Sequence, residues 1–333
     1  MIKTDYSEVN NLFLSYPKDF DTDYQTLVPF YRQLIGLIPD NIKQFIIVNS
    51  HEAGEEINIL FPEKRIEIIQ IEGFKEIWLR DILGFNAGMN RIYKPIYKPD
   101  YCDYLYPKKY LDLINDQVFD IFSKSTNSEV IEMPLVLDCG NLVHNGSIGF
   151  ITNKIINDNP EVKAYIKKII SDYLGLQAIF IGTNKHDKLS HADGYLNFLT
   201  ESKICLSNYP SMPFLAQDIK YLNTLSDIVS AEHLEIVNFY DRPVAEKVNG
   251  GGKFVNDKSS DCLSSARGIF VNFLILNDTI ILPEYTLPSF RREIDFNRVN
   301  RHTLESLGYK VIGINCDLLA KLGGSIRCCT FTS

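Results

Sequence analysis

Short apolar runs rich in β-branched residues recur along the chain and indicate buried β-strands. Runs of four to eight such residues are typical of strands that are covered on both faces. Five of them span residues 65–71, 130–137, 178–182, 234–239 and 310–315. We therefore expect five buried strands that each begin a structural unit.

A single order of elements follows each buried strand. It consists of a short polar stretch, a second strand with its hairpin partner, and an amphipathic helix with apolar residues at i, i+3 and i+4 spacing. The hairpin turns are predicted at residues 88–90, 144–146 and 277–278, and the helices at 23–38, 108–124, 160–174, 215–231 and 288–306. Such recurrence predicts a repeated supersecondary unit with five helices on the outside.

The two ends of the chain each carry a strand without a local partner. Residues 11–16 read as an opening strand and residues 325–332 as a terminal strand. Pairing them would remove both free edges and close a ring. Residues 241–266 have neither helical nor strand periodicity and predict a loop insertion. No linker interrupts residues 1–333, so we expect a single catalytic domain of class α+β.

Charge and cysteine content narrow the class of protein. The chain has 42 acidic and 34 basic residues, a net charge of -8 that disfavours nucleic acid or an anionic membrane as a partner and favours a cationic ligand. Seven cysteines in a chain of this length point to reduced thiols, and no signal or membrane-spanning run is evident. The expectation is a cytoplasmic protein with a small-molecule ligand, for which an oligomer is possible.

Chemically capable side chains gather in the polar stretches after the buried strands. The stretches read WLRD at 78–81, DCGN at 138–141, HADG at 191–194 and GGSIRCC at 323–329. Equivalent points of a ring of repeats converge near its axis. A planar cation such as guanidinium is matched by carboxylates in bidentate geometry, so Asp81 and Asp193 are the candidate clamps.

Cys328 is the candidate nucleophile. Its thiol needs a nearby cation or a proton acceptor, and Arg327, His191 or the substrate itself could serve. In a strand, His191 and Asp193 would share one face, whereas Cys328 and Cys329 would lie on opposite faces. If the Cys328 thiolate attacks the carbon of a bound guanidinium, ammonia leaves and needs a proton, which His191 would supply.

Other residues in or near these motifs could bind the substrate or have a structural role. Trp78 could form a wall against the aliphatic part of a substrate or pack in the core. Asp138 and Asn141 could orient the substrate or cap a turn. Arg267, together with Lys253, could receive a substrate carboxylate. Arg80 is expected to pair with a structural carboxylate, because a cation pointed at a guanidinium would oppose its binding.

The motifs WLRD, HADG and a near-terminal GGSIRC resemble those of the guanidino-group-modifying (pentein) superfamily, in particular its agmatine deiminase and bacterial peptidylarginine deiminase branch. The resemblance covers nearly the whole chain, with NNLFLSYP and GIFVNFLILNDTIILPEY similar to further segments of the family. It implies a five-bladed β/α propeller around a central active site. It further implies that Asp81 and Asp193 bind the guanidinium, that His191 is general acid and base, and that Cys328 forms a thiouronium intermediate.

Three departures from the agmatine-specific pattern leave the substrate open. The family's Gly-Pro after WxRD, its Glu-Gly-Gly motif and its His before the cysteine are replaced by residues 82–85, by Asp138-Cys139-Gly140-Asn141 and by Arg327. Agmatine, arginine and arginyl peptides are all candidate substrates. No cofactor is expected, and the cysteines and histidines lack the paired spacing of a zinc site.

Two alternatives to a deiminase use the same residues. An amidinotransferase would pass the amidino group to an amine instead of water. A non-catalytic propeller would bind a cationic ligand or a protein partner without reacting with it.

Overall fold

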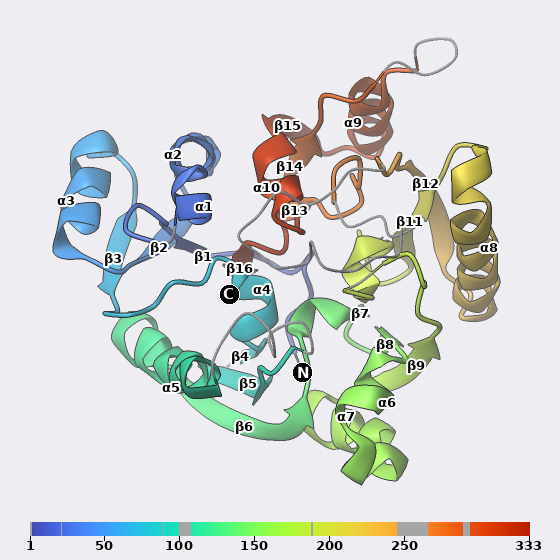
Figure 1. The fold of residues 1–333 in the computed structure, drawn as a ribbon, viewed down its shortest axis with the longest axis horizontal. Coiled ribbons are helices and arrows are strands. Elements are labelled where there is room, and N and C mark those ends of the chain that lie inside the picture. The colour runs from blue at the N-terminus through green and yellow to red at the C-terminus, as the bar shows by residue number, and fades with distance from the viewer. Residues whose placement is uncertain are drawn as a thin grey trace.

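The strands in the described part of the chain form five separate mixed sheets that lie around a common centre (Figure 1). The computed structural model describes residues 2–20, 22–88, 90–99, 108–187, 189–244, 266–288 and 294–333. Within this part of the chain the fold is α+β, as the sequence predicts. Both ends of the chain lie near the centre of the ring of sheets, and α7, α8 and α9 lie on its outside.

Four of these sheets share one pattern, in which a hairpin is followed by a parallel third strand. They consist of β4 (Phe85–Gly88), β5 (Arg91–Ile96) and β6 (Glu129–Val136); β7 (Leu142–His144), β8 (Ile148–Thr152) and β9 (Gln177–Ile181); β10 (Leu196–Phe198), β11 (Lys203–Asn208) and β12 (Glu235–Tyr240); and β13 (Leu274–Leu276), β14 (Thr279–Glu284) and β15 (Lys310–Asn315). The predicted hairpin turns at 144–146 and 277–278 are confirmed, and Asn277 there adopts a left-handed φ of 63° that asparagine tolerates. The turn at 88–90 joins β4 to β5, although its residue 89 is outside the described part of the chain.

The fifth sheet joins the two ends of the chain. Its order is β16 (Thr330–Thr332), β1 (Asn11–Ser15), β2 (Lys43–Val48) and β3 (Ile66–Gln70). β16 pairs antiparallel with β1, with Leu12 opposite Thr332 and Phe13 opposite Phe331. The predicted closure is therefore confirmed, although β16 is shorter than the strand expected at 325–332. β2 was not predicted.

The burial of the five predicted strands differs from the expectation. All five exist as β3, β6, β9, β12 and β15, but each is the outermost strand of its sheet and has exposed or half-exposed positions. In two of these sheets the other two strands, β10 with β11 and β13 with β14, are buried along most or all of their length. β10 and β13 are edge strands too, so the exposed third strand is the one at the opposite edge of the sheet. The apolar composition therefore predicts the strand positions correctly and their burial wrongly.

The predicted helices are present, all with shorter bounds except α5, which extends one residue further than predicted. They are α2 (Val28–Leu37), preceded by α1 (Thr22–Gln25), α5 (Lys108–Ser125), α7 (Ile166–Leu174), α8 (Ala216–Ala231) and α9 (Phe296–Ser306). α9 begins later than expected because Asp295 caps it, its side chain accepting the amide N–H of Arg298. Short helices that the sequence did not predict are α3 (His51–Leu60), α4 (Leu79–Ile82), α6 (Lys154–Asp158) and α10 (Asp317–Lys321).

Two remaining expectations concern the whole chain. Most of the predicted loop insertion, residues 245–265, lies outside the described residues, and the single-domain organisation stays a prediction. In the part of the chain that the structure describes, no helix has the length and apolar character that a membrane span requires.

Candidate active site

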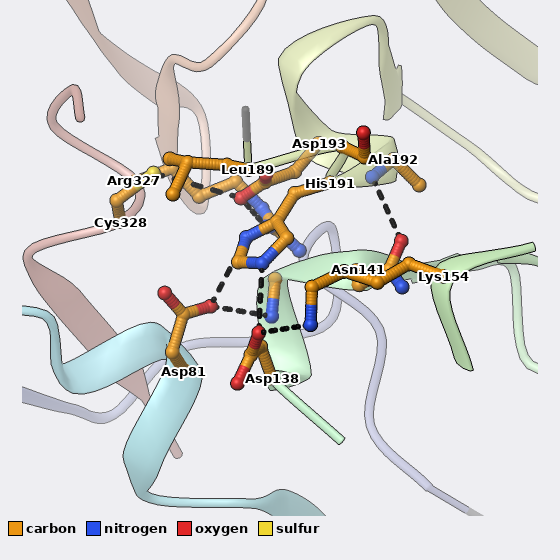
Figure 2. A network of polar contacts seen from close by, with 12 residues as sticks. Asp81, Asp138, Asn141, Lys154, Leu189, His191, Ala192, Asp193, Arg327 and Cys328 are labelled. Carbon is orange, nitrogen blue, oxygen red and sulfur yellow. Dashed lines mark hydrogen bonds and ion pairs between the residues drawn. The ribbon is translucent and has the colours of Figure 1, made fainter. Parts of the chain in front are cut away.

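Cys328 lies in a turn directly before β16, at the centre of the ring. The turn is attached to α4, because the amide of Arg80 donates to the Cys328 carbonyl oxygen at 3.1 Å. The Cys328 sulfur lies 3.3 Å from Asn272 Oδ1 and 3.7 Å from Asp193 Oδ2. Figure 2 shows Cys328 and Asp193 side by side above the ring of His191. As a whole residue, Cys328 is half-buried.

Cys329 is separated from this space by the backbone of the same turn. The prediction that Cys328 and Cys329 lie on opposite faces of a strand is wrong, because β16 begins only at Thr330. Cys329 is nevertheless fully buried in the apolar core, and its thiol donates to the Ile326 carbonyl oxygen at 3.3 Å. Its packing is that of a small core side chain.

The two candidate clamps converge beside Gly140. Asp81 belongs to α4, Asp193 to a short 3₁₀ turn at Ala192–Gly194, and both are buried. The Gly140 amide donates to Asp81 Oδ1 at 2.9 Å. A Cβ atom on Gly140 would lie 2.5 Å from Asp81 Oδ1 and 3.0 Å from Asp193 Oδ2, so both carboxylates face the same small space. Only glycine leaves that space open.

His191 lies between two carboxylates (Figure 2). Its Nε2 is 3.0 Å from Asp138 Oδ2, and its Nδ1 is 3.7 Å from Asp81 Oδ1. Burial alone would lower the pKa of His191, but Asp81 and Asp138 outweigh it and raise the pKa to about 9. The ring is therefore an imidazolium at neutral pH.

The prediction that His191 and Asp193 share one face of a strand is wrong, although both side chains reach the site. Residues 191–193 are not a strand, because the chain turns into the 3₁₀ turn after His191. Asn141 fixes this turn, since its Oδ1 accepts the amides of Ala192 and Thr152 at 3.2 Å each. Both bonds of Asn141 go to backbone, as expected of a turn-capping side chain.

Asp138 has a second cationic partner in Lys154. The Lys154 Nζ lies 3.2 Å from Asp138 Oδ2 and 2.7 Å from Asp158, and both Lys154 and Asp138 are buried. Burial alone would raise the pKa of Asp138, but His191 and Lys154 lower it. Asp138 is thus an anion held against His191 (Figure 2).

The thiol of Cys328 is neutral in the free protein. Burial raises its pKa well above the usual value, and the charges of Asp193 and Asp81 add to this effect, whereas Arg327 opposes it. Burial also raises the pKa of Asp81, to about 6. An additional cation in this space would favour the thiolate.

The remaining predicted residues have different surroundings. The Trp78 ring lies across Gly324, where a Cβ atom would approach Trp78 Cζ3 to 2.3 Å, so the ring borders the turn that carries Cys328. Arg267 pairs instead with Asp317, its Nε lying 3.2 Å from Asp317 Oδ1. The expected pairing of Arg80 is confirmed with Asp5, at 3.0 Å. Residue 253 lies outside the described residues.

Sequence reasoning missed Asn272, Lys154 and Asp5. Asn272 Oδ1 accepts the Cys328 amide at 3.3 Å, and its Nδ2 donates to the Asp193 carbonyl oxygen at 3.1 Å. Its signal was available, because it lies just before the first hairpin of the fourth unit, with Phe273 between it and β13, as Asn141 lies just before that of the second. Lys154 and Asp5 had no comparable signal. Across the described ranges, no group of three or more His, Cys, Asp or Glu side chains is arranged to hold a metal ion.

Comparisons with known proteins give one family and many structures of similar fold. The family model described as Porphyromonas-type peptidyl-arginine deiminase matches residues 1–333. No curated protein matches the chain in sequence. The C. jejuni agmatine deiminase is 15% identical, with a TM-score of 0.77 over 99% of this chain and 95% of that one.

Two further structures have similar values. A crystal structure of a putative peptidyl-arginine deiminase is 19% identical, with a TM-score of 0.76 over 100% of this chain and 98% of that one. The putative arginine deiminase of Porphyromonas gingivalis is 15% identical, with a TM-score of 0.74 over 100% and 97%. At these identities the likeness concerns the α+β fold with mixed sheets.

Proposed function

The chain belongs to the Porphyromonas-type peptidyl-arginine deiminase family, and we propose that it hydrolyses the guanidinium group of agmatine or another arginine-like compound, releasing ammonia and a ureido product. Membership confirms the resemblance to the pentein superfamily that the motifs indicated. It also makes the chain a cysteine-dependent hydrolase that modifies guanidino groups. The observation that carries the proposal is that one thiol, one imidazole and two carboxylates face one small space.

In this proposal, Asp81 and Asp193 hold the substrate guanidinium. Both oxygens nearest Gly140 belong to buried carboxylates, and buried carboxylates bind a planar cation far more strongly than exposed ones do. The cation also lowers the pKa of the Cys328 thiol, whose rise is partly due to the same two carboxylates. Substrate binding thus generates the thiolate next to the carbon that it attacks, and the thiol proton is released to solvent.

The proposed reaction then proceeds in two halves. The Cys328 sulfur adds to the guanidinium carbon, His191 donates a proton to one nitrogen, and ammonia leaves with the C–N bond electrons. A thiouronium remains on sulfur. Water attacks its carbon while His191 takes back one proton. As the C–S bond breaks, its electrons go to sulfur and the second water proton returns to that sulfur, which gives the neutral ureido product and the Cys328 thiol. The raised pKa of His191 keeps the proton available for the first half.

The proposal extends to the architecture. We assign the five sheets as the blades of a five-bladed β/α propeller with the active site at its centre. Support comes from the common strand order and from the candidate residues, which precede the first hairpin strand of their units.

A substrate panel tests the proposed function. Ammonia and ureido product are measured with agmatine, free arginine and arginyl peptides, with and without an added amine acceptor. Cys328→Ala should abolish turnover, whereas Cys329→Ala, which alters a core thiol in the same turn, should retain it. An amidino product on the added amine would identify an amidinotransferase, and turnover by Cys328→Ala would refute the assignment.

A further inference from the structure

An acidic side chain from the N-terminal segment is connected to the candidate clamp Asp193 through Arg327. Asp5 Oδ2 accepts hydrogen bonds from Arg327 Nε at 3.1 Å and Nη2 at 2.8 Å. The remaining nitrogen, Arg327 Nη1, donates to Asp193 Oδ2 at 2.6 Å. That oxygen is the one 3.7 Å from the Cys328 sulfur. A continuous line of charge-assisted bonds therefore leads from residue 5 to the reacting sulfur.

Asp5 also holds the second guanidinium of this region. Its Oδ1 lies 3.0 Å from Arg80 Nη1, so one carboxylate bridges Arg80 and Arg327. The two guanidinium groups repel each other, and Asp5 is the anion between them. Arg327 is almost completely buried, with a side-chain exposure of 4%, so its charge depends on protein partners rather than on water.

The segment that carries Asp5 is itself fixed at several points. The Lys3 amide donates to the Asn86 carbonyl oxygen at 2.7 Å, the Tyr6 hydroxyl to that of Asn145 at 2.8 Å, and the Val9 amide to Asn277 Oδ1 at 2.8 Å. These bonds reach three different sheets. The position of the carboxylate is therefore set by the closed ring and not by the segment alone.

We infer that Asp5 is a positioning residue for the reaction: through Arg327 it fixes the Asp193 carboxylate beside Cys328 and balances the positive charge of Arg80 and Arg327 near the sulfur. The inference rests on the proposed function, in which Asp193 binds the guanidinium. Asp5 itself lies behind Arg327 and touches neither substrate nor sulfur in this scheme.

Asp5→Asn removes the charge while the side chain keeps its size. The value of kcat/KM should fall about a hundredfold, because Arg327 loses its anchor and Asp193 its fixed direction. Alkylation of Cys328 should change in a different way. The unbalanced guanidinium groups should favour an anionic reagent, so the rate ratio of iodoacetate to iodoacetamide should rise about threefold. Greater exposure of the thiol would accelerate both reagents alike.

The measurement uses the full chain in a Cys329→Ala background, so that the labelled sulfur is unambiguous by mass spectrometry. Glu8→Gln is the matched control: it removes the same charge from the same segment at an exposed position, and should leave both readouts unchanged. An unchanged reagent ratio in Asp5→Asn would overturn the inference, whatever its turnover. If the wild-type chain releases no ammonia from any guanidino compound, the proposed function fails and the reagent ratio still decides the role of Asp5 at the sulfur.

A second variant decides the question if Asp5→Asn does not fold. Asp5→Glu keeps the charge, so the reagent ratio should stay at the wild-type value. Its longer side chain displaces Arg327, so kcat/KM should still fall at least about tenfold. Wild-type turnover in this variant, or a raised reagent ratio, would contradict the inference.

Discussion

Replacing Asp138 by asparagine tests the electrostatic basis of the proposed acid. His191 titrates at a pKa of about 9 instead of the usual 6.5, a difference that corresponds to about 3 kcal/mol favouring the imidazolium. Asp138 contributes through a 3.0 Å hydrogen bond and through its charge, whereas Asp81 contributes from 3.7 Å. A carboxylate in direct contact shifts a pKa by about one to three units. We therefore expect Asp138→Asn to lower the pKa of His191 to about 6–8.

The assay is an NMR titration of the His191 imidazole, whose resonance is identified by its absence in His191→Gln. Because the imidazolium is the proton donor, kcat at pH 8.5 should fall at least about threefold in Asp138→Asn. Asp158→Asn removes a carboxylate from the other side of Lys154 without contacting His191, so it should leave the midpoint near 9. A midpoint that stays near 9 in Asp138→Asn would refute the reasoning.

Three further predictions concern space, thiol position and pH. Gly140→Ala should reduce kcat/KM at least about a hundredfold, because the added methyl group occupies the space between Asp81 and Asp193. Gly194→Ala is the control and should keep activity, because its Cβ would meet nothing within 4 Å. Equal effects of the two substitutions would contradict this prediction. Asn272→Ala should lower kcat/KM about tenfold or more in the folded protein, because Cys328 loses the acceptor of its amide; wild-type kinetics would exclude this role. Burial raises the pKa of Glu76 from 4.5 to about 7, so stability is lost as the pH rises from about 4.5 through 7. Glu76→Gln should therefore stabilise the protein by up to about 3 kcal/mol more at pH 8 than at pH 4, measured by thermal unfolding, and a pH-independent effect would contradict the assignment.

The strand positions could be predicted because apolar, β-branched runs between turn residues are a local signal. Their burial could not, since it depends on the position of each strand in its sheet and on which edge of that sheet other elements cover. β12, predicted to be covered, is an edge strand, whereas β11 beside it is buried along most of its length. The pairing of β1 with β16 was predictable, because each end had a strand and no local partner.

The candidate site divides in the same way. Cys328, His191, Asp81 and Asp193 could be proposed from residue type and motif order, although the strand geometry assumed for His191 and Asp193 was wrong. Asn272 was missed even though it stands at the equivalent point of its unit.

What the sequence by itself determined is the order of units, the chemistry of the polar stretch in each and the family to which the chain belongs. Only the tertiary structure decided which groups meet. Asp138 contacts His191 across 53 positions of sequence, and Arg327 contacts Asp5 across 322. The physical reason is that the strength of an ion pair, and with it the pKa of His191 and the charge balance at Cys328, depends on distance and burial. Both are set by the closure of the ring and have no local signal in the chain.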